Sequence, residues 1–246
     1  MLCFTDYESG WLFKYDCMSG NLLKFEHSVV EFEDRITVQI NKDLYLFSME
    51  PLAAYKCEKV VDITALEVPT CIELATTDHN REDFSVTNFG NCVIYITGGL
   101  VDCTPSNSVL TFHISDDSFC SDLIPSMNES RCNHSSTVAG GKVWVFGGSN
   151  STQKALDTIE VLDVMAKKIN GWWKPCGETM ITWQTIKTKA FTARLYPSVC
   201  AISPSKILIC GGSGRSGDLS SVLMFDTVAK TADKIFHAPF EFRGVS

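Results

Sequence analysis

The sequence lacks the motifs of several common functional classes. It contains no Gly-x-Ser-x-Gly turn of a hydrolase and no Cys-x-x-Cys pair, and its five histidines are scattered. The glycine-rich stretch at 211–214 follows an apolar run without the Lys-Ser/Thr or the helix of a phosphate-binding loop. Cys132-Asn133-His134 is the nearest approach to a metal-ligand spacing, but no second pair lies near it. We therefore predict no catalytic residue, no metal site and no cofactor.

The sequence also lacks a basic surface and a membrane signal. Its formal net charge is −8 and it has no basic cluster, so we expect neither nucleic acid nor an anionic membrane as a partner. Residues 1–8 lack a positively charged start, and no segment reaches the roughly 18 apolar residues of a membrane helix. The 11 cysteines, without a secretory signal, indicate reduced thiols and predict a cytoplasmic protein, with a cytoskeletal or nuclear location as alternatives.

One short stretch occurs three times, as an apolar run that ends in Gly-Gly. The copies are residues 93–99, 142–148 and 206–212. Each run is β-branched or aromatic and too short for a helix, which is typical of a strand buried on both faces. The first glycines of the three pairs are 49 and 64 residues apart, so the chain repeats a unit of about 50 residues.

The residues between the copies follow a fixed order. A second strand follows each Gly-Gly, then a more polar third strand, then an arginine that precedes the next Gly-Gly strand. The arginines lie 16 or 17 residues before the next glycine pair: Arg81, Arg131 and Arg194. Four strands per unit predict an antiparallel blade.

Weaker copies extend the pattern to both ends of the chain. Residues 43–49 align with the Gly-Gly strand, and residues 11–16 align with the strand that follows it, so the first unit is expected to lack its two inner strands. Arg243 is expected to open a further unit, which predicts that this chain is part of a longer one or of a larger complex; a five-bladed ring closed by an imperfect strand is the alternative. The expected units are a half blade at 1–30, blades at about 31–70, 81–125, 131–190 and 194–237, and the start of a further blade at 238–246.

The 64-residue interval contains an insertion. It is about 14 residues longer than the ~50-residue period, and the extra residues lie around 168–182, before Trp183. They include Trp172 and Trp173, which are candidates for an exposed contact surface or for packing on the outer strand.

These features resemble the kelch repeat family. The resemblance rests on the three Gly-Gly strands, on Leu162-Asp163 and Phe225-Asp226 downstream of them, and on Arg131-Cys132-Asn133-His134, which matches the family's Arg-x-x-His. It implies an all-β fold, a β-propeller of about five four-stranded antiparallel blades, because stacking blades around an axis buries both faces of each sheet. It also implies that arginines near this position bind partners.

The candidate binding residues lie at repeated positions. A ring of arginines is able to hold an acidic peptide through bidentate contacts, whereas the alternative is that the same arginines bond loop carbonyls between blades. The loops after the Gly-Gly pairs add further candidates on the same face. The complete set is Arg81, Arg131, Arg194, Arg243, Asp102, Asn107, Asn150, Arg215, Asp218, Trp172 and Trp173.

Three functions remain open from the sequence. The first is a non-enzymatic interaction module, a scaffold or substrate-recognition propeller that binds a protein or an acidic peptide. The second is an enzyme on the same fold, either a copper oxidase or a sugar-processing enzyme, and a copper site requires convergent His and Tyr ligands. The third is a structural subunit of a cytoskeletal or ciliary assembly. The absence of catalytic motifs favours the first.

Overall fold

The computed structural model describes residues 2–5, 12–16, 21–25, 36–41, 43–58, 70–121, 124–164, 166–169, 172–175 and 181–238. Within these ranges the chain forms strands and turns and no helix, so the expected all-β class is confirmed. The chain divides into two compact units: one comprises Met1–Arg81 with Ser115–Phe119, and the other comprises Glu82–Ile114 with Cys120–Ser246.

The first unit contains two antiparallel sheets. The three-stranded sheet has the order β1-β2-β3, with strands Leu2–Thr5, Leu12–Asp16 and Asn21–Phe25. The expectation that the first repeat unit, at 1–30, lacks both inner strands is wrong, because β1 precedes β2 in the chain and pairs with it. The four-stranded sheet has the order β4-β5-β6-β7, with strands Ile36–Ile40, Asp43–Phe47, Ala53–Glu58 and Thr70–Thr76.

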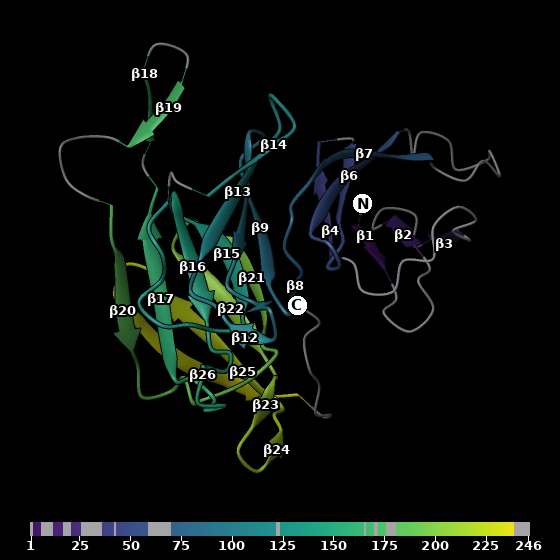
Figure 1. Ribbon diagram of the computed structural model, residues 1–246. Coiled ribbons are helices and arrows are strands. Elements are labelled where there is room, and N and C mark those ends of the chain that lie inside the picture. Colours follow the sequence, from purple (N-terminus) through teal and green to yellow (C-terminus); the bar gives the residue numbers. More distant parts are fainter. Residues whose placement is uncertain are drawn as a thin grey trace. The chain divides into compact units, whose positions relative to one another are not determined.

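Three further four-stranded antiparallel sheets follow (Figure 1). The first has the order β9-β10-β13-β14, with strands Ser85–Phe89, Val93–Thr97, Val109–His113 and Ser118–Cys120. The second has the order β15-β16-β17-β20, with strands Ser135–Ala139, Lys142–Phe146, Thr158–Asp163 and Trp183–Lys187. The third has the order β21-β22-β25-β26, with strands Ser198–Ser203, Lys206–Cys210, Ser221–Asp226 and Thr231–His237. We call these sheets blade A, blade B and blade C.

Short strands occupy the loops between the main ones. The strand β8 (Arg81–Glu82) belongs to a small sheet with β11 (Leu100–Val101) and β12 (Thr104–Pro105). The strands β23 (Ser213–Gly214) and β24 (Gly217–Asp218) form a hairpin in blade C. The insertion of blade B forms a separate hairpin of β18 (Ala166–Ile169) and β19 (Trp172–Pro175), which lies outside the four-stranded sheet.

The Gly-Gly strand of blade B is buried on both faces, as its continuous apolar run predicts. Val143 and Val145 pack in a cluster with Tyr95 of blade A. The alternate residues Trp144 and Phe146 pack in a second cluster, with residues such as Ile207 and Phe225 of blade C. Because successive side chains of a strand point to opposite faces, one strand contributes to two inter-blade cores.

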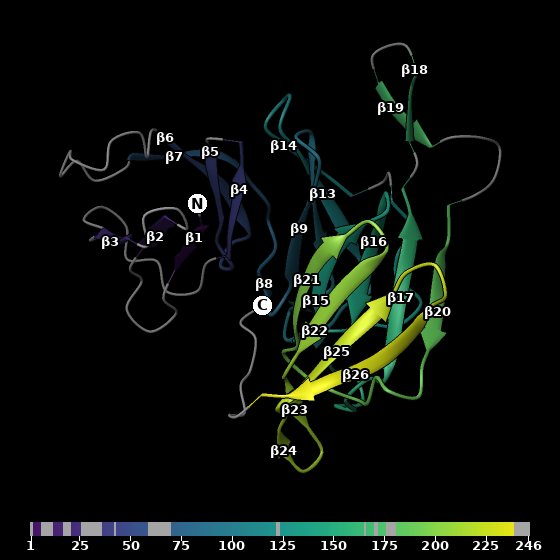
Figure 2. The ribbon, with the colours of Figure 1, turned by 180° about the vertical axis from the view of Figure 1, so that it is seen from behind.

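The innermost strands of the three blades lie side by side. The strand β15 of blade B is next to β9 of blade A on one side and to β21 of blade C on the other, and the two opposite views show the blades stacked in this order (Figures 1 and 2). This is the arrangement of successive blades in a propeller.

The cysteines differ in part from the expected reduced state. Six of them are free thiols in the described part of the chain, but Cys71 on β7 is disulfide-bonded. The expectation of uniformly reduced cysteines is therefore wrong at this position, and the cellular location stays a prediction.

Candidate functional site

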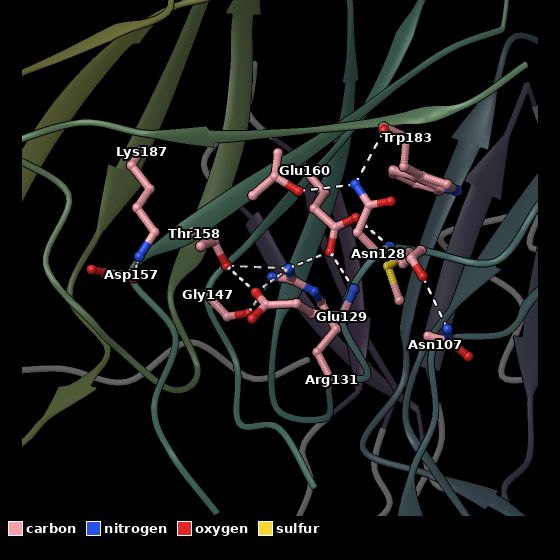
Figure 3. Close-up of polar contacts among 12 residues, drawn as sticks. Asn107, Asn128, Glu129, Arg131, Gly147, Asp157, Thr158, Glu160, Trp183 and Lys187 are labelled. Carbon is pink, nitrogen blue, oxygen red and sulfur yellow. Dashed lines mark hydrogen bonds and ion pairs between the residues drawn. The ribbon is translucent and has the colours of Figure 1, made fainter. Parts of the chain in front are cut away.

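Arg131 lies between blade A and blade B with its side chain fully buried. Its Nη1 donates to the carbonyl oxygen of Gly147 at 2.7 Å, and its Nη2 lies 3.3 Å from Thr158 Oγ1. The same Nη2 donates to Glu160 Oε1 at 2.6 Å (Figure 3). The arginine therefore joins the end of the Gly-Gly strand of its own blade to the start of the strand that follows it.

Glu160 supplies the counter-charge for Arg131, and its side chain is also fully buried. Its carboxylate accepts the backbone N–H groups of Asn128, at 2.7 Å, and Glu129, at 3.1 Å (Figure 3). A buried carboxylate is stable only when paired and hydrogen-bonded, and this one has three donors. The sequence analysis did not single out Glu160, although a charged residue in the apolar run Ile159-Glu160-Val161 is a signal for a buried ion pair.

Arg194 repeats this arrangement in blade C. Its Nη1 donates to the Gly211 carbonyl oxygen at 3.0 Å and lies 3.4 Å from Ser221 Oγ. Its guanidinium carbon lies 5.0 Å from the ring centroid of Phe191, a distance at which a cation and an aromatic face attract. Thr158 in blade B and Ser221 in blade C thus each provide a hydroxyl group to the arginine of their own blade.

The backbones of the same arginines contact the preceding blade. The N–H of Gly99 in blade A donates to the Arg131 carbonyl oxygen at 2.8 Å, and the N–H of Gly148 in blade B donates to that of Arg194 at 2.9 Å. The backbone carbonyl of each arginine therefore binds the glycine pair of the preceding blade. The side chain of the same arginine binds the glycine pair of its own blade. We call this repeated connection the arginine latch.

The latch explains why glycine occupies the first position of the pairs in blades A and B. Gly147 has φ +63°, and an added Cβ would lie 2.5 Å from the Arg194 carbonyl oxygen. At Gly98 the corresponding Cβ would lie 2.3 Å from the Arg131 carbonyl oxygen and 2.6 Å from the ring of His134. Real Cβ atoms do not approach so closely, so a side chain here would push the blades apart.

The three described arginines at the repeated position before the Gly-Gly strands are buried rather than displayed on a surface. Arg81, Arg131 and Arg194 are 6%, 0% and 1% exposed. Burial lowers the pKa of Arg81 and of Arg194 to about 10, which leaves both guanidinium groups charged at neutral pH. This geometry favours the structural alternative of the sequence analysis. Partner binding by these arginines stays a prediction, and Arg243 lies outside the described residues.

The loops after the glycine pairs have matching anchors. The first glycine of each pair donates to the residue at the end of its loop: Gly98 to Ser108, Gly147 to Thr158 and Gly211 to Ser221. The carbonyl of each second glycine accepts from a residue within the loop: Ser106, Leu156 and Leu219. In blades A and B the next arginine also donates its N–H to the loop, at Ser106 and Leu156. We call the three loops, residues 98–108, 147–158 and 211–221, the Gly-Gly loops.

The candidate residues of these loops differ in exposure. Asp102, Asn107 and Arg215 are exposed, and the Asn107 amide donates to the Met127 carbonyl at 3.0 Å. Asn150 is half-buried, and its Oδ1 accepts from the backbone of Thr152 and Lys154, so it shapes its own loop. Asp218 is half-buried in the β23–β24 hairpin. Trp172 and Trp173 begin β19, which belongs to the separate hairpin outside the four-stranded sheet of blade B.

A row of polar residues that the sequence analysis missed lies two positions after each arginine. Asp83, Asn133 and Tyr196 all have positive φ, between 49° and 55°. The Asn133 N–H donates to the Asp83 carbonyl at 3.1 Å, and the Tyr196 N–H donates to the Asn133 carbonyl at 2.8 Å. With its amide nitrogen turned toward Asp83, Asn133 lies 3.0 Å from both carboxylate oxygens and from the Tyr196 hydroxyl. This row joins the three blades at the start of their innermost strands.

The described residues show no other constellation of chemical groups. His134 is buried, and its Nε2 lies 3.0 Å from Thr97 Oγ1, which connects blade B to blade A. Within the described ranges, no group of three or more His, Cys, Asp or Glu side chains has the geometry of a metal site. Nor does that part of the chain contain a helix long and apolar enough to cross a membrane.

Comparison with known proteins supports the kelch resemblance. Residues 130–168, which include the latch of blade B, match the family model of the Kelch motif. A segment of 102 residues is 30% identical to Putative adagio-like protein 2 of Oryza sativa subsp. japonica, and the same holds for Adagio protein 3 of Arabidopsis thaliana. Each match covers 41% of this chain and 14% of the relative, so the chain corresponds to a small part of either protein. The expected kelch resemblance is confirmed, and it indicates a protein-interaction propeller.

Proposed function

We propose that this chain is a non-enzymatic protein-interaction module that binds its partner through the Gly-Gly loops. The observation that carries the proposal is that backbone hydrogen bonds hold the ends of these loops while residues at their tips are exposed. A loop held in place by a rigid scaffold presents side chains without a large ordering cost on binding, which is how many interaction surfaces are built.

In blades A and B, the anchors of the loop come from two neighbouring blades. In the loop at 147–158, Leu156 donates to Gly148 of its own blade and accepts from Arg194 of the next. Residues 151–154 between these anchors are all exposed. The same separation occurs in blade A, where Ser106 is bonded on both sides and residues 102–104 are exposed.

The arginines have a supporting role in this proposal. They hold the loops in place through the latch, while exposed residues such as Asp102, Lys154 and Arg215 contact the partner. Because these tips carry charges of both signs, the partner of this face is a protein surface of mixed charge rather than an acidic peptide. Since the chain spans 14% of the relatives that it matches, we further propose that the module recognises the partner on behalf of a larger protein or complex.

A pair of matched variants tests the proposal. Asp102→Arg with Arg215→Glu reverses the charge at two loop tips, and Asp233→Arg with Lys234→Glu makes the same two charge reversals on the exposed outer strand β26. Proteins captured from a cell extract by the wild type should be lost with the loop variant and kept with the β26 variant. If both variants capture the same set, the loops do not bind the partner.

A further inference from the structure

A small pocket lies between blade A and blade B, at the turn that joins β9 to β10. Its volume is about 150 Å³. Blade A lines it with Phe89, Val93, Tyr95 and the turn residues 90–92, and blade B lines it with Val164 at the end of β17. The Gly-Gly pair of blade A follows the other end of β10, so this pocket is separate from the Gly-Gly loops.

The pocket continues the apolar core between the two blades. Val93 and Tyr95 are alternate residues of β10, and both pack in one cluster with Val164. The rings of Phe89 and Tyr95 meet edge to face, with their centroids 6.2 Å apart. The described residues that line the pocket include no charged side chain, so a charged ligand would lose its hydration there without a counter-ion. An apolar cavity of roughly 150 Å³ is large enough for a molecule of the size of benzene.

The hydroxyl group of Tyr95 gives this pocket a polar feature. Tyr95 is only 6% exposed, and it lines the pocket. Within the part of the chain that the structure describes, its hydroxyl group has no hydrogen-bond partner. Burial raises the pKa of Tyr95 to about 12, so the phenol keeps its proton at neutral pH and is available as a donor. Because a buried polar group without a partner is unfavourable, an acceptor brought by a ligand would be stabilised here.

The same position of blade B shows how a polar group at this place is paired inside the protein. Trp144 lies three residues before the first glycine of its pair, as Tyr95 does in blade A. The Trp144 indole N–H donates to the Ala139 carbonyl oxygen, beside the β15–β16 turn, at 3.1 Å. That turn has two residues, 140–141, whereas the β9–β10 turn has three, 90–92. In blade A, with its longer turn, no described carbonyl takes this role for Tyr95.

We propose that this pocket binds a small uncharged molecule, with a single apolar ring between the two blades and one carbonyl oxygen that accepts the Tyr95 hydroxyl. The volume sets the size of the ligand, and the apolar lining excludes a charge. A free small molecule fits better than a side chain of a partner protein. The neutral side chains that present an acceptor oxygen, those of Asn, Gln, Ser, Thr and Tyr, also carry a donor. Phe89, Val93 and Val164 offer no acceptor for that donor.

Ligand-observed NMR with the full chain tests the proposal with three molecules of one shape. Acetophenone carries the carbonyl oxygen, isopropenylbenzene has a carbon in its place, and benzamide adds an N–H donor. We expect acetophenone to bind with a Kd no weaker than about 1 mM. Tyr95→Phe should weaken acetophenone about fivefold and leave isopropenylbenzene within about twofold, because it removes the hydroxyl group and keeps the ring. No binding of acetophenone, equal losses for both ligands in Tyr95→Phe, or benzamide binding as tightly as acetophenone would overturn the proposal.

Two exposed cysteines of the wild-type chain locate the ligand without any substitution. Cys92 lines the pocket, whereas Cys103 lies in the Gly-Gly loop of the same blade and does not line it. Saturating acetophenone should slow the reaction of iodoacetamide with Cys92 at least about threefold and leave the rate at Cys103 unchanged. Binding without protection of Cys92, or equal protection of both cysteines, would refute the site. Because the loop variant of the proposed function changes no residue of this pocket, the two proposals fail independently.

Discussion

Arg131 Nη2 donates to Glu160 Oε1 at 2.6 Å, and neither side chain is exposed to solvent. The two residues are on different elements of one blade, and Arg131 is also the residue whose backbone accepts the N–H of Gly99 in the preceding blade. An ion pair thus fixes the residue that joins two sheets.

Removal of Arg131 should destabilise the chain strongly. Arg131→Met leaves the Glu160 carboxylate buried without its cation, which costs about 3–5 kcal/mol of the free energy of unfolding. The double variant with Glu160→Leu should recover at least about 1 kcal/mol, because it removes the unpaired charge. Urea unfolding of both variants checks this. A cost below about 1 kcal/mol for Arg131→Met would contradict the assigned role.

Two glycines with the same φ angle separate local strain from blade packing. Gly147 and Gly90 both have φ +63°, but a Cβ at Gly147 would lie 2.5 Å from the Arg194 carbonyl oxygen, whereas a Cβ at Gly90 has no atom within 4 Å. We expect Gly90→Ala to cost about 1 kcal/mol and Gly147→Ala about 3 kcal/mol of the free energy of unfolding. Equal costs would show that the close approach of the Arg194 carbonyl to Gly147 does not affect stability.

The regularities of the repeat were predictable from the sequence, and its contacts were not. The Gly-Gly strands appear in the structure because their β-branched and aromatic runs require burial on both faces. The spacing from arginine to glycine marked Arg131 and Arg194 as repeated residues. It did not reveal that they face carbonyl groups inside the protein, because an arginine on a loop has the same local pattern whether it is buried or exposed.

Other features required the three-dimensional arrangement. The pairing of Glu160 with Arg131 joins residues 29 positions apart, and no local pattern reports it. The strand β1 was missed because residues 2–5 lack the glycine pair that identifies the equivalent strand elsewhere. Asp83, Asn133 and Tyr196 share a position but no chemical type, so only their common distance from the arginine identifies them in the sequence.

Cysteine reactivity should follow burial. Burial, with the nearby charge of Asp83 as a smaller cause, raises the pKa of Cys132 to about 11, so its thiol stays protonated at pH 8. Cys92 and Cys103 are exposed. Iodoacetamide at pH 8, followed by peptide mass spectrometry, should modify the two exposed cysteines at least about tenfold faster than Cys132. Comparable rates in the native protein would contradict the buried position of Cys132.

Asp226 should make stability depend on pH in acid. The hydrogen bond from Lys206, supported by the N–H groups of Ala229 and Val228, lowers the pKa of Asp226 to about 2. The lowered pKa means that this carboxylate stabilises the fold above its ordinary pKa near 3.8 and that the effect is lost as the pH falls through 2. Asp226→Asn should therefore be less stable than the wild type at pH 7, with a gap that closes between pH 4 and pH 2. A gap that stays constant over this range would rule out the assigned bonds.

The arginine latch is tested most directly by the hydrogen exchange of the Gly148 amide, measured by NMR. This N–H donates to the Arg194 carbonyl oxygen of the next blade at 2.9 Å, whereas Gly217 lies at the exposed tip of the β23–β24 hairpin. If neighbouring blades are joined through their arginines, Gly148 exchanges as slowly as the core strand residue Val145. Exchange of Gly148 at the fast rate of Gly217 would show that the blades are not joined at this point.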